Sequence, residues 1–98
     1  MSFEYRIHVT GGPVSLARVG DRLRGEGLVV VHQAESETAL AHASVLQEQV
    51  DRWGGEVVVS KEDGGLFVRL LFARDRGYLA VIVEEIESQG LKGQVEEV

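Results

Sequence analysis

The two ends of this chain look like copies of one structural unit, and this constrains the fold more than any other feature. An offset of 63 positions places residues 3–28 on residues 66–91 without a gap. Arg6 then matches Arg69, and Gly27-Leu28 matches Gly90-Leu91. The match predicts a β-α-β unit that occurs twice, at about 3–34 and 66–98, within a single domain of residues 1–98. Duplication and a shared hydrophobic pattern both explain it.

The first half of the chain contains four predicted elements. Residues 3–10 alternate between apolar and polar side chains, which predicts a half-buried strand. A helix is expected over 14–24 and a strand with little exposed face over 28–31. Apolar residues at spacings of three and four predict a long helix over 36–53, capped by Ser36 and ending at Trp53.

The second half adds a hairpin, a helix and a last strand. Strands are expected over 56–60 and 66–73, joined by the Gly-rich turn at 61–65. Asp75 is the expected cap of a helix over 76–89, whose inward residues are Leu79, Ile82 and Ile86. A short strand over 94–98 follows.

The resulting order is β-α-β-α-β-β-α-β, an α+β pattern. The part from Leu28 onward resembles the ferredoxin-like α/β sandwich. This resemblance implies one mostly antiparallel sheet with its helices mainly on one face. It implies no activity, because this fold carries many unrelated functions.

Charge and composition limit the classes of partner. The 98-residue chain has a formal net charge of −6, and its acids lie mostly after residue 34. An acidic surface repels phosphate backbones, so no nucleic-acid partner is expected. No apolar run reaches membrane-spanning length, and there is no cysteine, so we expect no membrane partner and a cytoplasmic protein, of bacterial or phage origin.

The open face of the predicted sheet is the first candidate binding surface. If the matched strands are neighbours, Arg6 and Arg69 lie close together beside His8, where two guanidinium groups suit a carboxylate or phosphate. The alternative is that they pair with Glu4 and Glu56 in an ordinary surface network.

Apolar side chains on the same face predict an interface. Phe67 and Leu71 alternate with the inward residues of their strand, so they point toward the open face. A second copy of the sheet would cover them and give a homodimer. The alternative cover is the long helix that ends at Trp53.

Three functions follow from these surfaces. The first is a non-enzymatic binding or regulatory module for a protein partner or small anionic ligand. The second is an acidic inhibitor protein, of a phage- or toxin-associated type, that covers a basic site with Glu84, Glu85 and Glu87. The third is an acid–base enzyme that uses His8 with Glu4. The three histidines lack the sequence spacing of metal ligands, so we assign no metal site. We also assign no cofactor and no catalytic residue.

Overall fold

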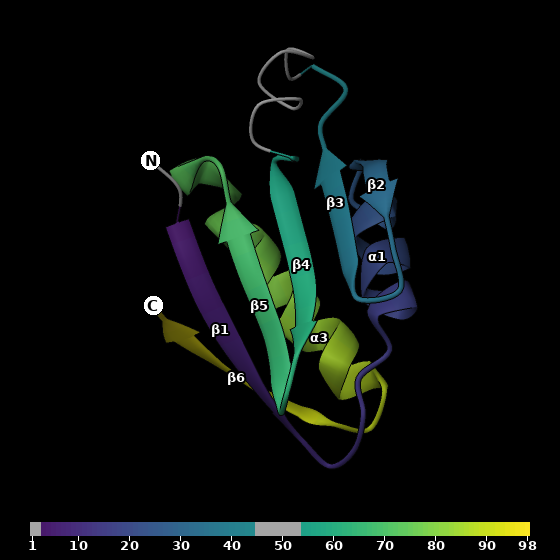
Figure 1. The fold of residues 1–98 in the computed structure, drawn as a ribbon, viewed down its shortest axis with the longest axis vertical. Helices are drawn as coiled ribbons and strands as arrows, with labels where there is room; N and C mark the ends of the chain where they lie inside the picture. Colours follow the sequence, from purple (N-terminus) through teal and green to yellow (C-terminus); the bar gives the residue numbers. More distant parts are fainter. Residues whose placement is uncertain (1–2, 45–53) are drawn as a thin grey trace.

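The computed structural model describes residues 3–44 and 54–98, and it is an α+β structure with one antiparallel six-stranded sheet (Figure 1). The strand order is β2-β3-β4-β5-β1-β6. The elements are β1 (Phe3–Thr10), α1 (Leu16–Gly25), β2 (Val29–Gln33), β3 (Glu37–Ala41), β4 (Val57–Glu62), β5 (Gly65–Leu70), the 3-10 helix η1 (Ala73–Arg76), α3 (Gly77–Ser88) and β6 (Lys92–Glu97).

The two matched strands are neighbours in the sheet. β1 and β5 pair antiparallel, so that Ile7 lies opposite Leu66 and Arg6 lies opposite Phe67. The predicted alternation is present in both, because Tyr5 and Ile7 of β1 are buried while Glu4 and His8 are exposed. Each strand therefore has one side chain row in the core and one row on the other face.

The matched helices end in the same way, which gives the repeat a structural meaning. The N–H of Leu28 donates to the carbonyl of Leu23, and the N–H of Leu91 donates to that of Ile86. Gly27 and Gly90 precede these leucines with φ of 98° and 81°. This arrangement is the Schellman motif. It favours glycine at the position just after the helix, because the residue there adopts a left-handed backbone conformation.

The core lies between the sheet and the two helices. α1 contributes Val19 and Leu23, and α3 contributes Ile82 and Ile86, all fully buried as the apolar spacing predicts. In the view of Figure 1 both helices lie behind the strands. They also contact each other, since the guanidinium of Arg22 lies 2.8 Å from the carboxylate of Glu84. None of the described helices is long and apolar enough to cross a membrane.

The predicted helix over 36–53 is wrong for its described part. Glu37–Ala41 is strand β3, paired with β2 and β4, and residues 45–53 lie outside the described residues. Ser36 is not a helix cap but part of the β2–β3 connection, where the N–H of Ala34 donates to the carbonyl of Glu37. The alanines favour a helix locally, but pairing on both sides of β3 overrides this preference.

The predicted burial of the second strand is also wrong. β2 lies at the edge of the sheet, and Val29 and Val31 are 54% and 42% exposed. A run of four apolar residues suggests a strand covered on both faces, but here Leu28 and Val30 pack in or against the core while Val29 and Val31 face solvent. The register with β3 shifts between Val30 and His32, which is a β-bulge and is common at sheet edges.

Candidate functional site

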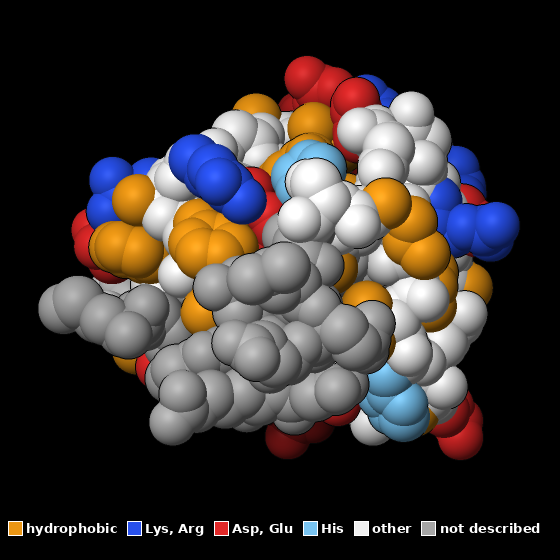
Figure 2. Space-filling view, turned by 90° about the horizontal axis from the view of Figure 1, so that it is seen from above, with side chains coloured by type: hydrophobic (Ala, Val, Ile, Leu, Met, Phe, Trp, Pro, Cys, Tyr) orange, Lys and Arg blue, Asp and Glu red, His pale blue; other side chains and the backbone are white. Residues whose placement is uncertain are grey.

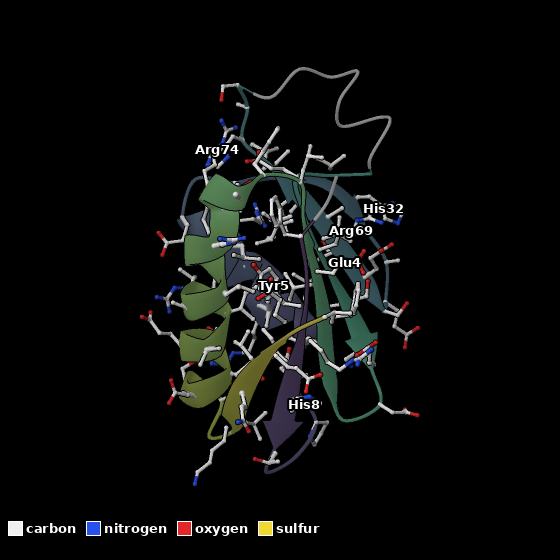
Figure 3. All side chains as sticks on the ribbon, turned by 90° about the vertical axis from the view of Figure 1, so that its left-hand side faces the viewer. Glu4, Tyr5, His8, His32, Arg69 and Arg74 are labelled. Carbon is white, nitrogen blue, oxygen red and sulfur yellow. The ribbon has the colours of Figure 1, made fainter. Side chains whose placement is uncertain are left out.

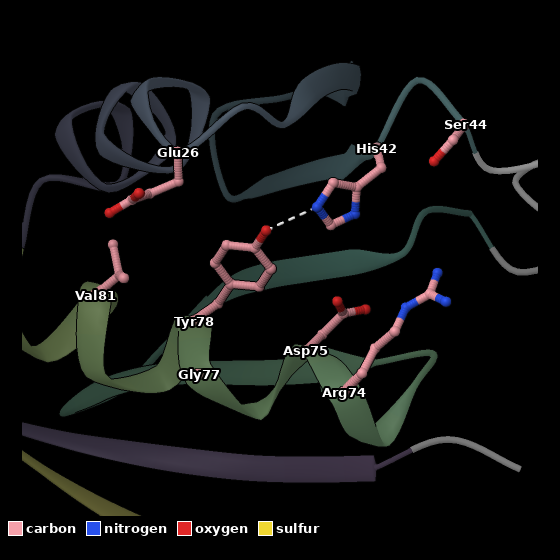
Figure 4. Close-up of a pocket in the computed structure, with 8 residues that line it drawn as sticks. All are labelled: Glu26, His42, Ser44, Arg74, Asp75, Gly77, Tyr78 and Val81. Carbon is pink, nitrogen blue, oxygen red and sulfur yellow. Dashed lines mark hydrogen bonds between the residues drawn. The ribbon is translucent and has the colours of Figure 1, made fainter.

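A pocket of about 470 Å³ opens between the C-terminal end of α1, the end of β3 and the start of α3 (Figure 4). The ends of β3 and α1 and the start of α3 lie at the upper end of the molecule in Figure 1. Figure 2 views this end from above, where histidine, acidic and basic side chains lie close together. The lining residues are Glu26, His42, Ser44, Arg74, Asp75, Gly77, Tyr78 and Val81.

A fully buried carboxylate lies beneath this pocket and holds His42. Glu56 immediately precedes β4 and is 0% exposed. Its Oε1 accepts the backbone N–H of His42 at 2.9 Å, and its Oε2 lies 2.9 Å from Nδ1 of the ring. Burial opposes ionisation of Glu56, but hydrogen bonds from Asp75 and His42 outweigh it and lower its pKa. Glu56 is therefore an ionised acceptor that fixes the orientation of the imidazole.

Tyr78 completes a carboxylate–imidazole–phenol chain. Because an ionised Glu56 can only accept, Nδ1 of a neutral His42 carries the proton and Nε2 is the acceptor. The hydroxyl of Tyr78 lies 2.8 Å from Nε2 and donates to it (Figure 4). Burial, and then the charges of Asp75 and Glu56, raise the pKa of Tyr78. The phenol is thus held protonated, with its oxygen at the pocket wall.

Asp75 is the second buried acid of the site. It lies in η1, is 2% exposed, and its Oδ2 accepts no hydrogen bond within residues 3–44 and 54–98. Burial, together with the hydrogen bond to Glu56 and the negative charge of that residue, raises the pKa of Asp75 to about 7. Near neutral pH the two carboxyl groups therefore share one proton, because two buried like charges repel each other.

Arg74 is the one basic side chain among the described lining residues. Its guanidinium lies 3.8 Å from Oε2 of Glu56 and also stacks on Phe72, with the carbon of the guanidinium 4.4 Å from the ring centre. The side chain is 65% exposed, so solvent weakens its attraction to Glu56. Arg74 therefore balances only part of the negative charge of Glu26, Glu56 and Asp75.

The arrangement offers two kinds of chemistry. It can hold a proton, or a positively charged group, between Asp75 and Glu56. It also gathers potential metal ligands, because one ligand atom each of His42, Glu56 and Asp75 all lie within 4.8 Å of one another.

The two arginines of the predicted anion site lie on the same face of the sheet, but in different surroundings. Arg6 lies opposite Phe67 and Arg69 lies opposite Glu4, so the two arginines are diagonal neighbours on β1 and β5. The Nε of Arg6 donates to Glu62 at 2.9 Å, toward the β4–β5 turn. A Cβ added at Gly54, beyond the other end of the strands, would lie 3.6 Å from the guanidinium of Arg69.

His8 lies away from Glu4 and Arg69, two of the three residues expected near it. Its Nε2 is 3.5 Å from Glu96 of β6. Figure 3 shows His8 toward one end of the sheet, with Glu4 and Arg69 together nearer the other end. The pairing of His8 with Glu4 that an acid–base enzyme was expected to use is therefore not a contact in this structure.

Phe67 and Leu71, the apolar residues expected on the open face, have different surroundings. Phe67 is half-buried between Arg6 of β1 and Ser60 of β4. Leu71 is also half-buried, but it follows the end of β5, and its N–H donates to the carbonyl of Glu56. Trp53, the alternative cover for this face, lies outside the described residues.

The predicted acidic surface on α3 is partly used within the molecule. Glu84 pairs with Arg22, and Glu87 is exposed. Glu85 is buried rather than exposed, since Gln89 and Ser88 donate to its Oε2 and Arg18 lies 3.4 Å from it. The arginines of α1 thus pair with acidic residues of α3 inside one molecule.

Sequence reasoning missed the pocket because its residues come from separate elements. Asp75 was expected to cap a helix, but it is buried in η1, and α3 has no side-chain cap. His42 falls within the helix predicted over 36–53, but it follows strand β3. One signal was available: Glu56 directly precedes the buried run Val57–Val59, and an acid next to such a run needs a partner.

Comparisons with known proteins identify no family. A scan against protein-family models, a search of curated proteins and a search of solved structures each returned no significant match.

Proposed function

We propose that this chain is a non-enzymatic binding or regulatory module that takes a small, positively charged ligand into the pocket beside Asp75. One observation carries the proposal: the Oδ2 atom of Asp75 is buried and accepts no hydrogen bond from the described residues. A buried acceptor without a donor is costly, and a ligand that donates a hydrogen bond removes this cost.

The charges around the pocket favour a cation over an anion. Glu26 and Asp75 line it and Glu56 lies directly beneath, whereas Arg74 is the described basic residue that faces them. Negative potential focused in a pocket attracts cations and repels anions. The small anionic ligand expected from the sequence has its support elsewhere, at Arg6 and Arg69, where Arg6 is already held by Glu62.

The contacts of His42 and Tyr78 support binding rather than acid–base catalysis. Glu56 and Tyr78 engage both ring nitrogens of His42, and the pKa of Tyr78 is raised. A phenol that is harder to ionise is a poor nucleophile and a stable hydrogen-bond partner. The chain from Glu56 to Tyr78 therefore fits a rigid wall that orients a ligand.

Two probes of similar shape and opposite charge test the proposal. Benzylamine and benzoate are each titrated into the ¹⁵N-labelled protein, and amide chemical shifts are followed. We expect benzylamine to shift the signals of His42, Asp75 and Tyr78, and benzoate to leave them unchanged at the same concentration. The Asp75→Asn variant should lose most of the benzylamine response, because Asn cannot supply the negative charge.

The matched control is Asp63→Asn, which removes an exposed acid at the β4–β5 turn. It should keep the benzylamine response. Benzoate shifts centred on Arg6 and Arg69, without benzylamine shifts at the pocket, would contradict the proposal and favour an anion site on the sheet.

We also propose that the framework is a ferredoxin-like sandwich extended by the strands β2 and β3. The order β6-β1-β5-β4 supports it, because α3 connects β5 to β6 across β1, as the second crossover of that fold does. Both helices would cover one face and leave the other open. This assignment differs from the one expected from the sequence, which began at Leu28 and used the predicted helix over 36–53. The sandwich would instead begin at β1, with α1 as its first helix.

A second candidate function is self-association, which the exposed apolar residues favour. Val29, Val31 and Val95 are exposed on the two edge strands β2 and β6, and Val98 directly follows β6. Edge strands present unpaired backbone groups, and apolar side chains beside them favour pairing with another strand. A second copy that pairs β2 with β2 would form a two-fold dimer.

Light scattering after size-exclusion chromatography tests this candidate. A dimer should be found for the wild type, and a monomer for Val31→Lys, because a lysine blocks pairing at the edge. Ala80→Lys adds the same charge at an exposed position of α3 and should leave the dimer intact. A monomeric wild type at all concentrations would rule the candidate out.

A further inference from the structure

We propose that the pocket binds a divalent first-row transition-metal ion through Nδ1 of His42 and the carboxylates of Glu56 and Asp75. This inference rests on the proposed function, since it names the chemical class of the positively charged ligand. It goes beyond that function by assigning the ligand atoms and by changing the role of Tyr78.

The spacing of the three groups is close to that of a metal site. Their ligand atoms all lie within 4.8 Å of one another, and Nδ1 of His42 is already 2.9 Å from Oε2 of Glu56. Metal–ligand bonds of about 2.0–2.2 Å place neighbouring ligand atoms about 3–3.5 Å apart. Small rotations of the Asp75 and Glu56 side chains would therefore bring the three atoms to coordination distance.

Two features besides the acidic character of the cluster point to a ligand. The first is the buried Oδ2 of Asp75, which has no donor among the described residues. The second is the imidazole, which an oxygen-only site for calcium or magnesium would not need. One nitrogen and two carboxylates suit manganese, iron, cobalt or zinc in the divalent state. The side of the cluster that faces the pocket leaves room for water ligands.

The surroundings provide the support that metal-bound histidines usually have. A ligating imidazole donates its second N–H to an acceptor, which fixes the ring. Nε2 of His42 lies 2.8 Å from the hydroxyl of Tyr78, which can accept as well as donate. In the metal-bound protein Nδ1 binds the ion, so the proton moves to Nε2 and Tyr78 becomes the acceptor. The tautomer of His42 is thus opposite in the two states.

Arg74 is the natural competitor of a bound cation. Its guanidinium lies 3.8 Å from Oε2 of Glu56, so it approaches one of the proposed ligand atoms. The side chain is largely exposed and stacks on Phe72, so it can move aside without leaving a buried charge unpaired. Removing the charge of Arg74 should therefore strengthen metal binding at this site. If the metal bound elsewhere on the protein, the same substitution would leave its affinity unchanged.

Cobalt titration tests the inference, because Co²⁺ bound to protein ligands has a visible absorption spectrum. We expect one Co²⁺ per chain and competition by Zn²⁺. Asp75→Asn and His42→Ala should each weaken binding at least about tenfold. Arg74→Gln should strengthen it. His8→Ala and His32→Ala remove exposed histidines outside the site and should leave the affinity unchanged. Circular dichroism establishes that each variant is folded.

The tautomer of His42 supplies an independent readout. Nitrogen chemical shifts of the ring should report the proton on Nδ1 without metal and on Nε2 with saturating Zn²⁺. Absence of stoichiometric cobalt binding, or binding that His8→Ala abolishes and Asp75→Asn leaves intact, would overturn the inference. If benzylamine still binds at the pocket in that case, the proposed function stands. If neither probe binds there, both proposals fail.

Discussion

The residue that organises the candidate site is Glu56. Its carboxylate contacts the backbone and ring of His42, and the Asp75 carboxyl shares its proton with it. A buried carboxylate without such partners would cost several kcal/mol, so each of these contacts is needed to keep it ionised. The position of Glu56 could be noticed in the sequence, but its partners could not, because they are fixed only by the packing of η1 and the end of β3 against β4.

The raised pKa of Asp75 predicts how stability depends on pH in the metal-free protein. Asp75 titrates at about 7 when folded, against an ordinary value of 3.8. Its contribution is fully present below the ordinary value and is lost as the pH rises through about 7, because the folded state binds the extra proton. The free energy of unfolding, measured by urea denaturation with a chelator present, should fall over this range.

Substitution of Asp75 isolates this effect from the groups around it. Glu56, His42 and Arg74 face Asp75, and all three remain in Asp75→Asn. Glu56 has a lowered pKa, so its contribution is lost only as the pH falls toward and below its ordinary value. The variant should therefore show a much flatter profile around neutral pH. An unchanged slope in Asp75→Asn would show that another group causes it.

At the scale of elements, β3 shows where a sequence pattern misleads. Its alanines and the spacing that continues beyond it are typical of a helix, yet Thr38–Ala41 are all buried within the sheet. The helix α1 instead packs over β3, and Gly20 of α1 faces Thr38. The strand at 3–10 was predictable because its apolar and polar side chains alternate, whereas β3 is buried along most of its length and has no alternation to read.

Thr38 provides a test of this arrangement. Its Oγ1 is buried and has no hydrogen-bond partner among the described residues. Thr38→Val keeps the shape and removes the unpaired hydroxyl, so it should stabilise the protein by about 1 kcal/mol in urea denaturation. Thr10→Val, at an exposed position of β1, should change stability by less than about 0.5 kcal/mol. Destabilisation by Thr38→Val would mean that the hydroxyl has a partner and that β3 packs differently.

At the scale of the whole molecule, the matched residues occupy corresponding strands and helix ends, but they do not locate the site. The matched strands β1 and β5 are neighbours, and both helices end in the same glycine-leucine motif. The site combines residues that are far apart in the sequence. His42 is 14 positions from Glu56 and 36 positions from Tyr78. None of these residues belongs to a local motif, so the pocket follows only from the three-dimensional fold.

The proposed cation site of this pocket consists of His42 and the buried Glu56 and Asp75. Anomalous diffraction at the zinc edge, from crystals of the wild-type protein grown with Zn²⁺, tests it most directly. We expect one strong peak about 2.0–2.2 Å from Nδ1 of His42 and from the carboxylates of Glu56 and Asp75. Peaks confined to exposed histidines such as His8, with the pocket unchanged, would contradict it.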